Sequence, residues 1–419
     1  MNLKQELTII AAKAQTASRM MTGVSSEQKN KVLKEMSAGL IKNKALIQKA
    51  NRKDIAGAKK SGLGRAFIDR LLLTDKRIRE MADSLLVIAN LDDPVGEVIK
   101  AWRVPSGLWI HKVRSPIGVI AIIYESRPNV TSDCIGLCFK SGNSVILRGG
   151  SEALNSNLAI FRILEAVIKK SDLPDGTINM VDTKDRRAID VLLKLNNYID
   201  LVMPRGGEAL IQRVSKLSRI PVIKHYKGIC HVFVDEWADL NMAEKVCFNA
   251  KVQRPGVCNA MESMLVHKDV AIRFLPGMIK QLRKAHVEIR GCPMTVKISR
   301  GTVKRATEKD YRTEYLGLVL SVKVVGELNE AIGHINNYGS HHSDSIITDN
   351  YDNAMQFLRQ VDSACVYVNA STRFTDGGQF GMGAEIGIST DKLHARGPMA
   401  LEELTTYKYM VFGSGQVRS

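Results

Sequence analysis

A cysteine on a loop marked by proline and glycine is the residue of this chain best suited to covalent chemistry. Cys258 follows Pro255 and Gly256, which break the regular structure between an expected helix and an expected strand. A thiol on such a loop can reach a cleft, and its thiolate is the attacking form. Arg254, a short way upstream, can help to hold the thiolate charge. The stretch therefore predicts a cysteine nucleophile.

Two glycine pairs follow expected strands, and each pair is preceded by an arginine. The residues are Arg148, Gly149, Gly150 and Ser151 in the first stretch, and Pro204, Arg205, Gly206 and Gly207 in the second. Glycines at the carboxyl end of a parallel strand let a ligand approach the backbone, and the next helix N-terminus favours a phosphate. Glycine pairs also make simple turns. Neither stretch is a Gly-x-Gly-x-x-Gly fingerprint, so a dinucleotide site and ordinary turns both remain open.

Two further polar stretches follow strands. One ends the first expected parallel strand and carries Glu125, Arg127 and Asn129. The other runs from Val368 to Thr390, is rich in Gly, Ser and Thr, and carries Arg373. A capped turn and a loose connector are the plainer interpretations of the two. Their polar groups favour a ligand site and an active-site wall, because binding groups of α/β proteins gather on loops at strand ends.

The elements that must position these residues are short apolar strands alternating with helices. In the first series, strands are expected at 117–123, 143–148, 177–181, 199–203 and 221–224, with helices at 130–140, 152–170, 186–195 and 208–217. In the second series, strands are expected at 231–234, 262–267, 318–325, 345–348 and 365–368. Such alternation predicts an α/β fold with two domains, each built on a parallel sheet covered on both faces.

The two ends of the chain are expected to add helices and a small β element. The chain reads as helical up to a break at Asp93, with Ser25 and Thr74 opening helices. A hairpin is expected over 103–115. The C-terminal stretch predicts a strand that pairs either with this hairpin or with a partner subunit.

The composition is that of a soluble globular protein of more than one domain. The chain has 419 residues, of which 45% are hydrophobic and 25% charged. No signal peptide or membrane span is recognisable, so the seven cysteines are expected to be reduced thiols in a cytoplasm. The net charge of +17 is spread along the chain, which argues against nucleic acid or membrane as a partner and favours a field that attracts anionic ligands.

Several stretches together closely resemble the gamma-glutamyl phosphate reductase family, a branch of the aldehyde dehydrogenase superfamily. They are YESRPNVT, GNSVILRGGSEA, YIDLVMPRGG, GICHVFVD, NAKVQRPGVCN, HSDSI, VYVNASTRFTDGGQFGMGAEIGIST, KLHARGPM and LTTYKY. The resemblance covers essentially the whole chain. It implies an aldehyde dehydrogenase-like fold with an NADP-binding domain (1–102 and 116–230), a catalytic domain (231–370) and a β oligomerisation element with the active-site wall (103–115 and 371–419).

The reaction that the resemblance implies is the NADPH-dependent reduction of L-glutamyl 5-phosphate to L-glutamate 5-semialdehyde and phosphate, a step of proline biosynthesis. Cys258 would form a thioester that accepts a hydride. The Cys258 backbone N–H and Asn259 are candidate oxyanion donors. The resemblance also implies a homo-oligomer, and glutamate 5-kinase is a plausible partner because an acyl phosphate is labile.

The remaining site residues follow from the substrate's charge and from the family. Because the substrate carries a phosphate and a carboxylate, Arg127, Arg254 and Arg373 are expected to bind it, together with Asn129. In the cofactor site, the family places Arg148 and Ser151 near the adenosine, with their neighbours Gly149 and Gly150, and Pro204 to Gly207 near the diphosphate. Glu314 aligns with the glutamate that holds the nicotinamide ribose. No metal is expected.

One departure from the aldehyde-oxidising enzymes bears on the direction of the reaction. Those enzymes carry a glutamate that activates water to hydrolyse the thioester, and the matching stretch here, KHYKGICHVF, has no acidic residue. Two alternatives remain: an aldehyde oxidiser, against which the missing acid counts, and a non-catalytic binding protein that uses the positive charge.

Overall fold

The computed structural model describes residues 2–125, 127–224 and 227–418. The chain forms two compact units, and each is described by itself. Unit 1 comprises Met1–Lys224, Gly381–Gly387 and Met399–Ser419. Unit 2 comprises His225–Phe380 and Ile388–Pro398. The three-part domain division expected from the resemblance, and the roles given to its parts, stay predictions.

A parallel sheet of four strands forms the centre of unit 1. In sheet order the strands are β5 (Ile178–Met180), β4 (Ser144–Arg148), β3 (Val119–Tyr124) and β6 (Leu201–Arg205). β3 and β4 are buried along their whole length, as expected of strands covered on both faces. The strand expected at 221–224 is reduced to one isolated bridge between Val222 and Val202.

The helices of unit 1 are α1 (Leu3–Met21), α2 (Ser26–Lys42), α3 (Lys44–Lys60), α4 (Arg65–Leu71), α5 (Asp75–Asn90), α6 (Asn129–Lys140), α7 (Leu154–Lys170), α8 (Arg187–Leu192) and α9 (Glu208–Leu217), with a 3-10 turn η1 (Ser151–Ala153) before α7. Three of these helices, α1, α2 and α5, begin at residues whose side chains cap them. The hydroxyls of Ser25 and Thr74 accept the N–H groups of Gln28 and Arg77 at 3.2 Å. Both predicted N-caps are therefore confirmed.

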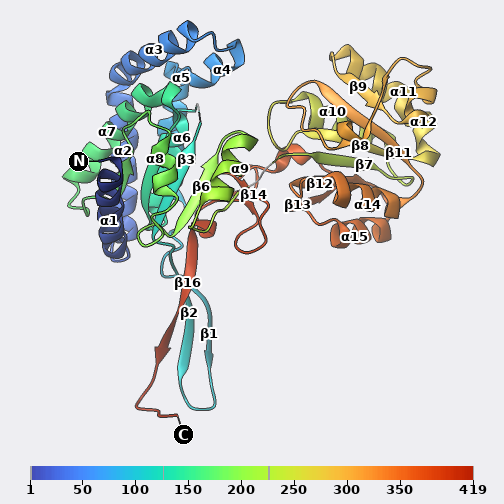
Figure 1. Ribbon diagram of the computed structural model, residues 1–419. Helices are drawn as coiled ribbons and strands as arrows, with labels where there is room; N and C mark the ends of the chain where they lie inside the picture. Colours follow the sequence, from blue (N-terminus) through green and yellow to red (C-terminus); the bar gives the residue numbers. More distant parts are fainter. Residues whose placement is uncertain (1, 126, 225–226, 419) are drawn as a thin grey trace. The chain divides into compact units, whose positions relative to one another are not determined.

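A separate antiparallel sheet holds the predicted hairpin and the C-terminal strand. Its order is β1 (Val98–Arg103), β2 (Trp109–Pro116) and β16 (Thr405–Phe412), preceded by the short η3 (Glu402–Leu404). β16 pairs with β2 along its full length, so pairing with the hairpin is the alternative that the structure shows (Figure 1). β16 leaves one edge unpaired by the described strands and exposes Tyr409, Val411 and Phe412.

Unit 2 is built on a parallel sheet of seven strands. Their order is β10 (Lys304–Arg305), β9 (Glu288–Gly291), β11 (Val319–Val325), β8 (Met261–His267), β7 (Cys230–Val234), β12 (Ser343–Ile347) and β13 (Cys365–Val368). β9 and β10 were not predicted, because both are short and partly exposed and lack an apolar run.

Helices cover both faces of this sheet (Figure 1). One face packs against α10 (Leu240–Val252) and α11 (Lys268–Lys284), and the other against α14 (Leu328–Tyr338) and α15 (Tyr351–Gln360). The smaller elements are α12 (Pro293–Ile298), α13 (Glu308–Tyr311), η2 (Thr372–Phe374), β14 (Ile388–Ser389) and β15 (Gly397–Pro398). The predicted α/β class with two parallel sheets is confirmed. In the described part of the chain, no helix has both the length and the apolar character to cross a membrane.

Candidate active site

The candidate nucleophile lies on the loop between the end of α10 and the start of β8, as the sequence predicts. Cys258 is half-buried, whereas the other six cysteines, all in the described part of the chain, are buried. Burial raises the pKa of Cys134, Cys138, Cys230 and Cys247, which keeps those thiols in their unreactive form. Cys258 is therefore the thiol of this chain with access to a ligand.

A glycine just before β7 fixes the backbone of Cys258. A Cβ atom at Gly228 would overlap the Cys258 backbone, so only glycine fits there. The Gly228 N–H donates to Glu314 Oε1 at 2.9 Å. Glu314 is thereby linked to Cys258 through a single residue. The structure therefore places Glu314 near the candidate nucleophile. Its predicted contact with the nicotinamide ribose stays a prediction.

A second, buried thiol holds the same loop from the other side. The Cys230 Sγ–H donates to the carbonyl oxygen of Cys258 at 3.2 Å. Because burial raises the pKa of Cys230, this thiol stays protonated and available as a donor. Sequence reasoning assigned no site role to Gly228 or Cys230, and only their place beside an expected strand start could have suggested one.

Asn259 ties the cysteine loop to the polar stretch that follows β13. Its side-chain Nδ2 donates to the Thr375 carbonyl at 2.8 Å, and the Thr372 hydroxyl donates to the Asn259 carbonyl at 2.8 Å. The amide of Asn259 is thus engaged with backbone and holds η2 against the loop. Its predicted role as an oxyanion donor stays a prediction, and this geometry favours a positioning role for its side chain.

Two arginines add positive charge beside the thiol. Arg373 is half-buried, and its Nε donates to Gln253 Oε1 at 2.8 Å. Burial, and then the charge of Arg254, lower the pKa of Arg373, while Cys258 acts in the opposite direction. Arg254 itself is exposed. Unit 2 therefore gathers Cys258, both arginines, Asn259 and Glu314, which can stabilise a thiolate and bind an anionic substrate.

In unit 1, the first glycine pair follows β4 and is buried. A Cβ atom at Gly149 would collide with Asn157 and approach Tyr124 at 3.1 Å, so this glycine serves internal packing. Gly150 precedes η1, where the Ser151 hydroxyl donates to Glu152 Oε1 at 3.1 Å.

The arginine before this pair is turned back onto its own chain. Arg148 is 6% exposed, and its Nη1 donates to the Gly149 carbonyl at 2.8 Å. Its Nε is buried and has no hydrogen-bond partner among the described residues. Burial lowers the pKa of Arg148, the negative charge of Glu152 opposes this, and the positive charge of Arg186 lowers it further. A buried guanidinium with an unused donor is a group that can bind an anion.

The second glycine pair is exposed and faces an acidic side chain. Gly207, at the start of α9, donates its N–H to Glu125 Oε2 at 2.8 Å, and a Cβ atom at Gly206 would lie 2.6 Å from the same carboxylate. Pro204 is buried within β6, and the Arg205 guanidinium packs on the backbone of Gly387. The predicted diphosphate position is therefore a helix N-terminus whose Gly207 N–H donates to Glu125.

The stretch after β3 also carries the two substrate-binding candidates of unit 1. Asn129 begins α6 and is exposed, and its Nδ2 donates to Asp133 Oδ2 at 3.0 Å. Arg127 is exposed as well. Loss of solvent raises the pKa of Asp133 to about 6, opposed by hydrogen bonds from Asn129 and Ser84 and by the charge of Arg205. Substrate binding by Arg127 and Asn129 stays a prediction.

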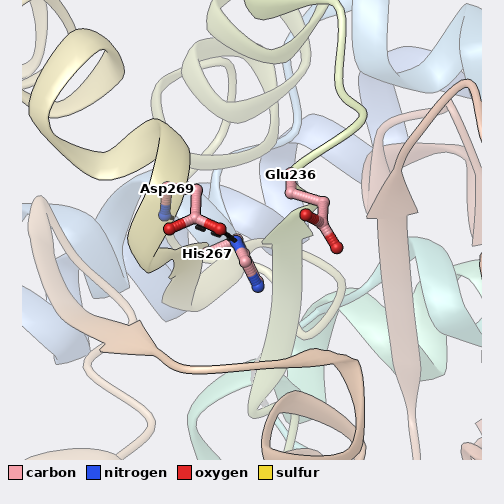
Figure 2. A group of neighbouring side chains, drawn as sticks. All are labelled: Glu236, His267 and Asp269. Atoms are coloured by element: carbon pink, nitrogen blue, oxygen red, sulfur yellow. Dashed lines mark hydrogen bonds and ion pairs between the residues drawn. The ribbon is translucent and has the colours of Figure 1, made fainter.

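A group of possible metal ligands lies at the other edge of the unit 2 sheet. Figure 2 shows Glu236, His267 and Asp269, whose ligand atoms lie within 4.8 Å of one another. His267 Nδ1, however, accepts the Asp269 N–H at 3.4 Å and caps α11. Because the nitrogen nearest to Asp269 is used in this cap, the cluster is explained by helix capping and carries no metal assignment.

Comparisons with known proteins agree on one family. The model of the "Aldehyde dehydrogenase family" matches residues 4–309 and 302–410. A gamma-glutamyl phosphate reductase of Thermodesulfovibrio yellowstonii is 55% identical over 418 residues, which is 100% of both chains. The crystal structure of a gamma-glutamyl phosphate reductase from Thermotoga maritima is 48% identical with a TM-score of 0.97, covering 99% of this chain and 100% of that one. The corresponding structure from Saccharomyces cerevisiae is 31% identical with a TM-score of 0.54, covering 100% and 99%.

Proposed function

The chain belongs to the aldehyde dehydrogenase family, and on that premise we propose that it reduces L-glutamyl 5-phosphate to L-glutamate 5-semialdehyde and phosphate with NADPH, as a step of proline biosynthesis. The observation that carries the proposal is the half-buried Cys258, held on its loop next to Glu314 and two arginines. The reductase name of full-length relatives supports the substrate.

Cys258 supplies the nucleophile. Its Sγ attacks the acyl carbon of the substrate, the bond from that carbon to the phosphate oxygen breaks, and phosphate leaves with the electron pair. Bound NADPH supplies the hydride that reduces the resulting thioester. The carbon–sulfur bond then breaks and the Cys258 thiolate is regenerated. The backbone N–H of Cys258 is our candidate donor to the oxyanion, because Gly228 and Cys230 fix that backbone.

The arginines of unit 2 bind the charged ends of the substrate in this proposal. Arg373 is half-buried and can offer its guanidinium to the phosphate, and Arg254 strengthens the local positive charge. Arg127 and Asn129 of unit 1 are further candidates. The stretch from Lys224 to Phe233 contains no acidic residue to activate water, so the thioester is preserved for reduction.

The cofactor is a nicotinamide dinucleotide, and we assign the preference for NADPH to the end of β4. Arg148 has an unused buried donor and lies within the electrostatic influence of Arg186. Two guanidinium groups near the adenosine suit a 2′-phosphate. The N-terminus of α9 at Gly207 suits the diphosphate.

The assembly and the partners are part of the same proposal. The unpaired edge of β16 and its exposed aromatic side chains fit a homo-oligomer, because an open strand edge readily pairs with another chain. Hand-over of the labile acyl phosphate from a glutamate 5-kinase in the cytoplasm would protect the substrate.

The decisive experiment runs the reaction in reverse. Purified protein is given glutamate semialdehyde and NADP⁺, and NADPH formation is followed with and without inorganic phosphate. We expect formation only when phosphate is present, with acyl phosphate as the product. Formation of free glutamate without phosphate would instead support an aldehyde oxidiser, and no turnover in either case would refute the proposal.

A further inference from the structure

A buried ion pair closes the base of the loop that carries Cys258. Lys251 is the second-last residue of α10, and Glu262 is the second residue of β8. Lys251 Nζ lies 2.5 Å from Glu262 Oε2, and both side chains are 0% exposed. The two ends of the loop from 253 to 260 are therefore joined by one contact beneath the candidate nucleophile.

The same carboxylate also reaches the segment that carries Glu314. Glu262 Oε1 accepts the backbone N–H of Leu316 at 3.1 Å. Leu316 has a φ of 52°, a left-handed conformation that a non-glycine residue adopts only when its surroundings hold it there. Lys251 Nζ lies 5.9 Å from the ring centre of Tyr315 in the same segment. One ion pair thus contacts both segments that meet at Cys258.

Together, these contacts form a continuous network around the candidate nucleophile. Glu262 holds Leu316, Glu314 accepts from Gly228, and Gly228 packs against the Cys258 backbone. Lys251, through its ion pair with Glu262, links this network to the end of α10. A displacement of either end of the loop would therefore move Cys258 relative to Glu314.

The energetics indicate that stability alone does not explain the pair. Burial raises the pKa of Glu262 to about 7 and lowers that of Lys251, so the fold opposes the charged forms that the contact needs. Buried ion pairs replaced by neutral side chains of similar volume are often as stable or more stable. A pair of this kind next to an active loop is better explained by the geometry that it imposes.

We propose that Lys251 and Glu262 are positioning residues for the reaction, which fix Cys258 relative to Glu314 by clamping the ends of the nucleophile loop. This inference rests on the proposed function. Neither side chain is exposed, so neither contacts substrate or cofactor, and both act through Cys258 and Glu314.

The test removes both charges together. Lys251→Met with Glu262→Gln leaves an amide oxygen for the Leu316 N–H but breaks the link between the loop ends. We expect kcat to fall by roughly 10- to 100-fold, because a displacement of about 1 Å can have that effect, while the KM for NADPH changes by less than about twofold. Thermal unfolding should show a folded protein.

A matched control variant removes a buried hydrogen bond of the same unit, at the carboxyl ends of the strands rather than at their amino ends. The Thr348 hydroxyl, 2% exposed, donates to Asp235 Oδ2 at 2.7 Å just after β12. Thr348→Val should lower the melting temperature yet leave kcat within about twofold of the native value. A similar loss of kcat in both variants would mean that stability, not position, is responsible.

Alkylation of Cys258 by iodoacetamide provides a readout that needs neither substrate nor cofactor. We expect the double variant to be alkylated several-fold faster, because a half-buried thiol becomes more accessible once its loop is released. The alkylation rate of Cys258 can be measured even if the protein does not catalyse the proposed reaction. The inference is overturned if the double variant keeps native kcat and alkylation rate, or if it does not fold, since the pair would then be structural.

Discussion

The two parallel sheets present their candidate site residues at opposite edges. In unit 1 these residues follow the strands: Glu125 comes after β3 and Gly206 after β6. In unit 2 three of them precede strands, Gly228 before β7, Cys258 before β8 and Glu314 before β11, whereas Arg373 follows β13. For the proposed sites, the rule that ligands bind at the carboxyl ends of parallel strands fits unit 1 and does not fit the nucleophile loop of unit 2.

The difference shows what each edge offers. Carboxyl edges lead into helix N-termini, whose free N–H groups suit the phosphates of a dinucleotide. The amino edge of unit 2 instead offers loops that end in fixed strands, which hold a thiol and its neighbours rigidly. In the proposed function, cofactor binding and covalent chemistry thus use opposite ends of the same kind of sheet.

The largest effect should come from the amino edge of unit 2. Cys258→Ala removes the nucleophile, and we expect kcat to fall by about 10⁴-fold or more, because loss of a nucleophile removes the covalent route. NADPH binding, measured by fluorescence titration, should change little. If this variant keeps its activity, Cys258 is not the nucleophile and the amino edge of unit 2 carries no covalent chemistry.

A smaller effect is expected at the carboxyl edge of β4. Replacing Arg148 by Ala should raise the KM for NADPH by about tenfold and the KM for the acyl phosphate much less, because a charge-assisted hydrogen bond is lost. Steady-state kinetics with each substrate varied in turn would measure both. Equal changes in the two KM values would argue against a place beside the adenosine. Arg148→Lys, which keeps the charge, serves as the control.

At the carboxyl end of β6, removal of a negative charge should improve the binding of NADPH. Glu125 accepts the Gly207 N–H at the N-terminus of α9, where the cofactor diphosphate is proposed to bind. Glu125→Gln should lower the KM for NADPH by about two- to fivefold, since one negative charge near a helix N-terminus is removed. A raised KM would show that Glu125 assists binding, and the diphosphate would have to be placed elsewhere.

The same edge should show a pH effect on stability. The pKa of Asp133 is raised from 3.8 to about 6, so its contribution to stability is complete below pH 4 and is lost as the pH rises through 6. Asp133→Asn cannot ionise and should lose less stability than the native protein between pH 4 and 7. Urea unfolding across this range measures the difference, and parallel curves would contradict the assignment.

The smallest effect is expected at the carboxyl edge of unit 2. Glu236 and Asp269 lie there beside His267, where the strand-end rule alone would place a site (Figure 2). The double variant Glu236→Gln with Asp269→Asn should keep kcat within about twofold, with or without added zinc. A tenfold loss of kcat would show that the carboxyl edge of unit 2 also contributes to catalysis, and the distinction between the two edges would no longer hold.

Much of the fold followed from the sequence because its strands are short apolar runs that alternate with amphipathic helices. The predicted bounds of α9 (208–217) and β13 (365–368) agree with the structure to the residue. β9 and β10 escaped prediction because they have only 4 and 2 residues. The apolar–polar alternation that indicates a half-buried strand is convincing only over a longer run.

The site was predictable where a residue's own chemistry marks it. Cys258 was found through the proline and glycine before it, which indicate a loop. Gly228 and Cys230 were not, because their importance arises from contacts made only after folding. Lys251 and Glu262 were not predicted either, because charged residues normally face solvent, and here both are enclosed.

The burial of six cysteines gives the protein a defined response to oxidants. Hydrogen peroxide in the surrounding medium would meet a single accessible thiol, that of Cys258, and in the proposed mechanism its conversion to a sulfenic acid would stop turnover while the fold stayed intact. A thiol reductant would then restore activity in full. The enzyme would behave as a reversible on–off element during oxidative stress.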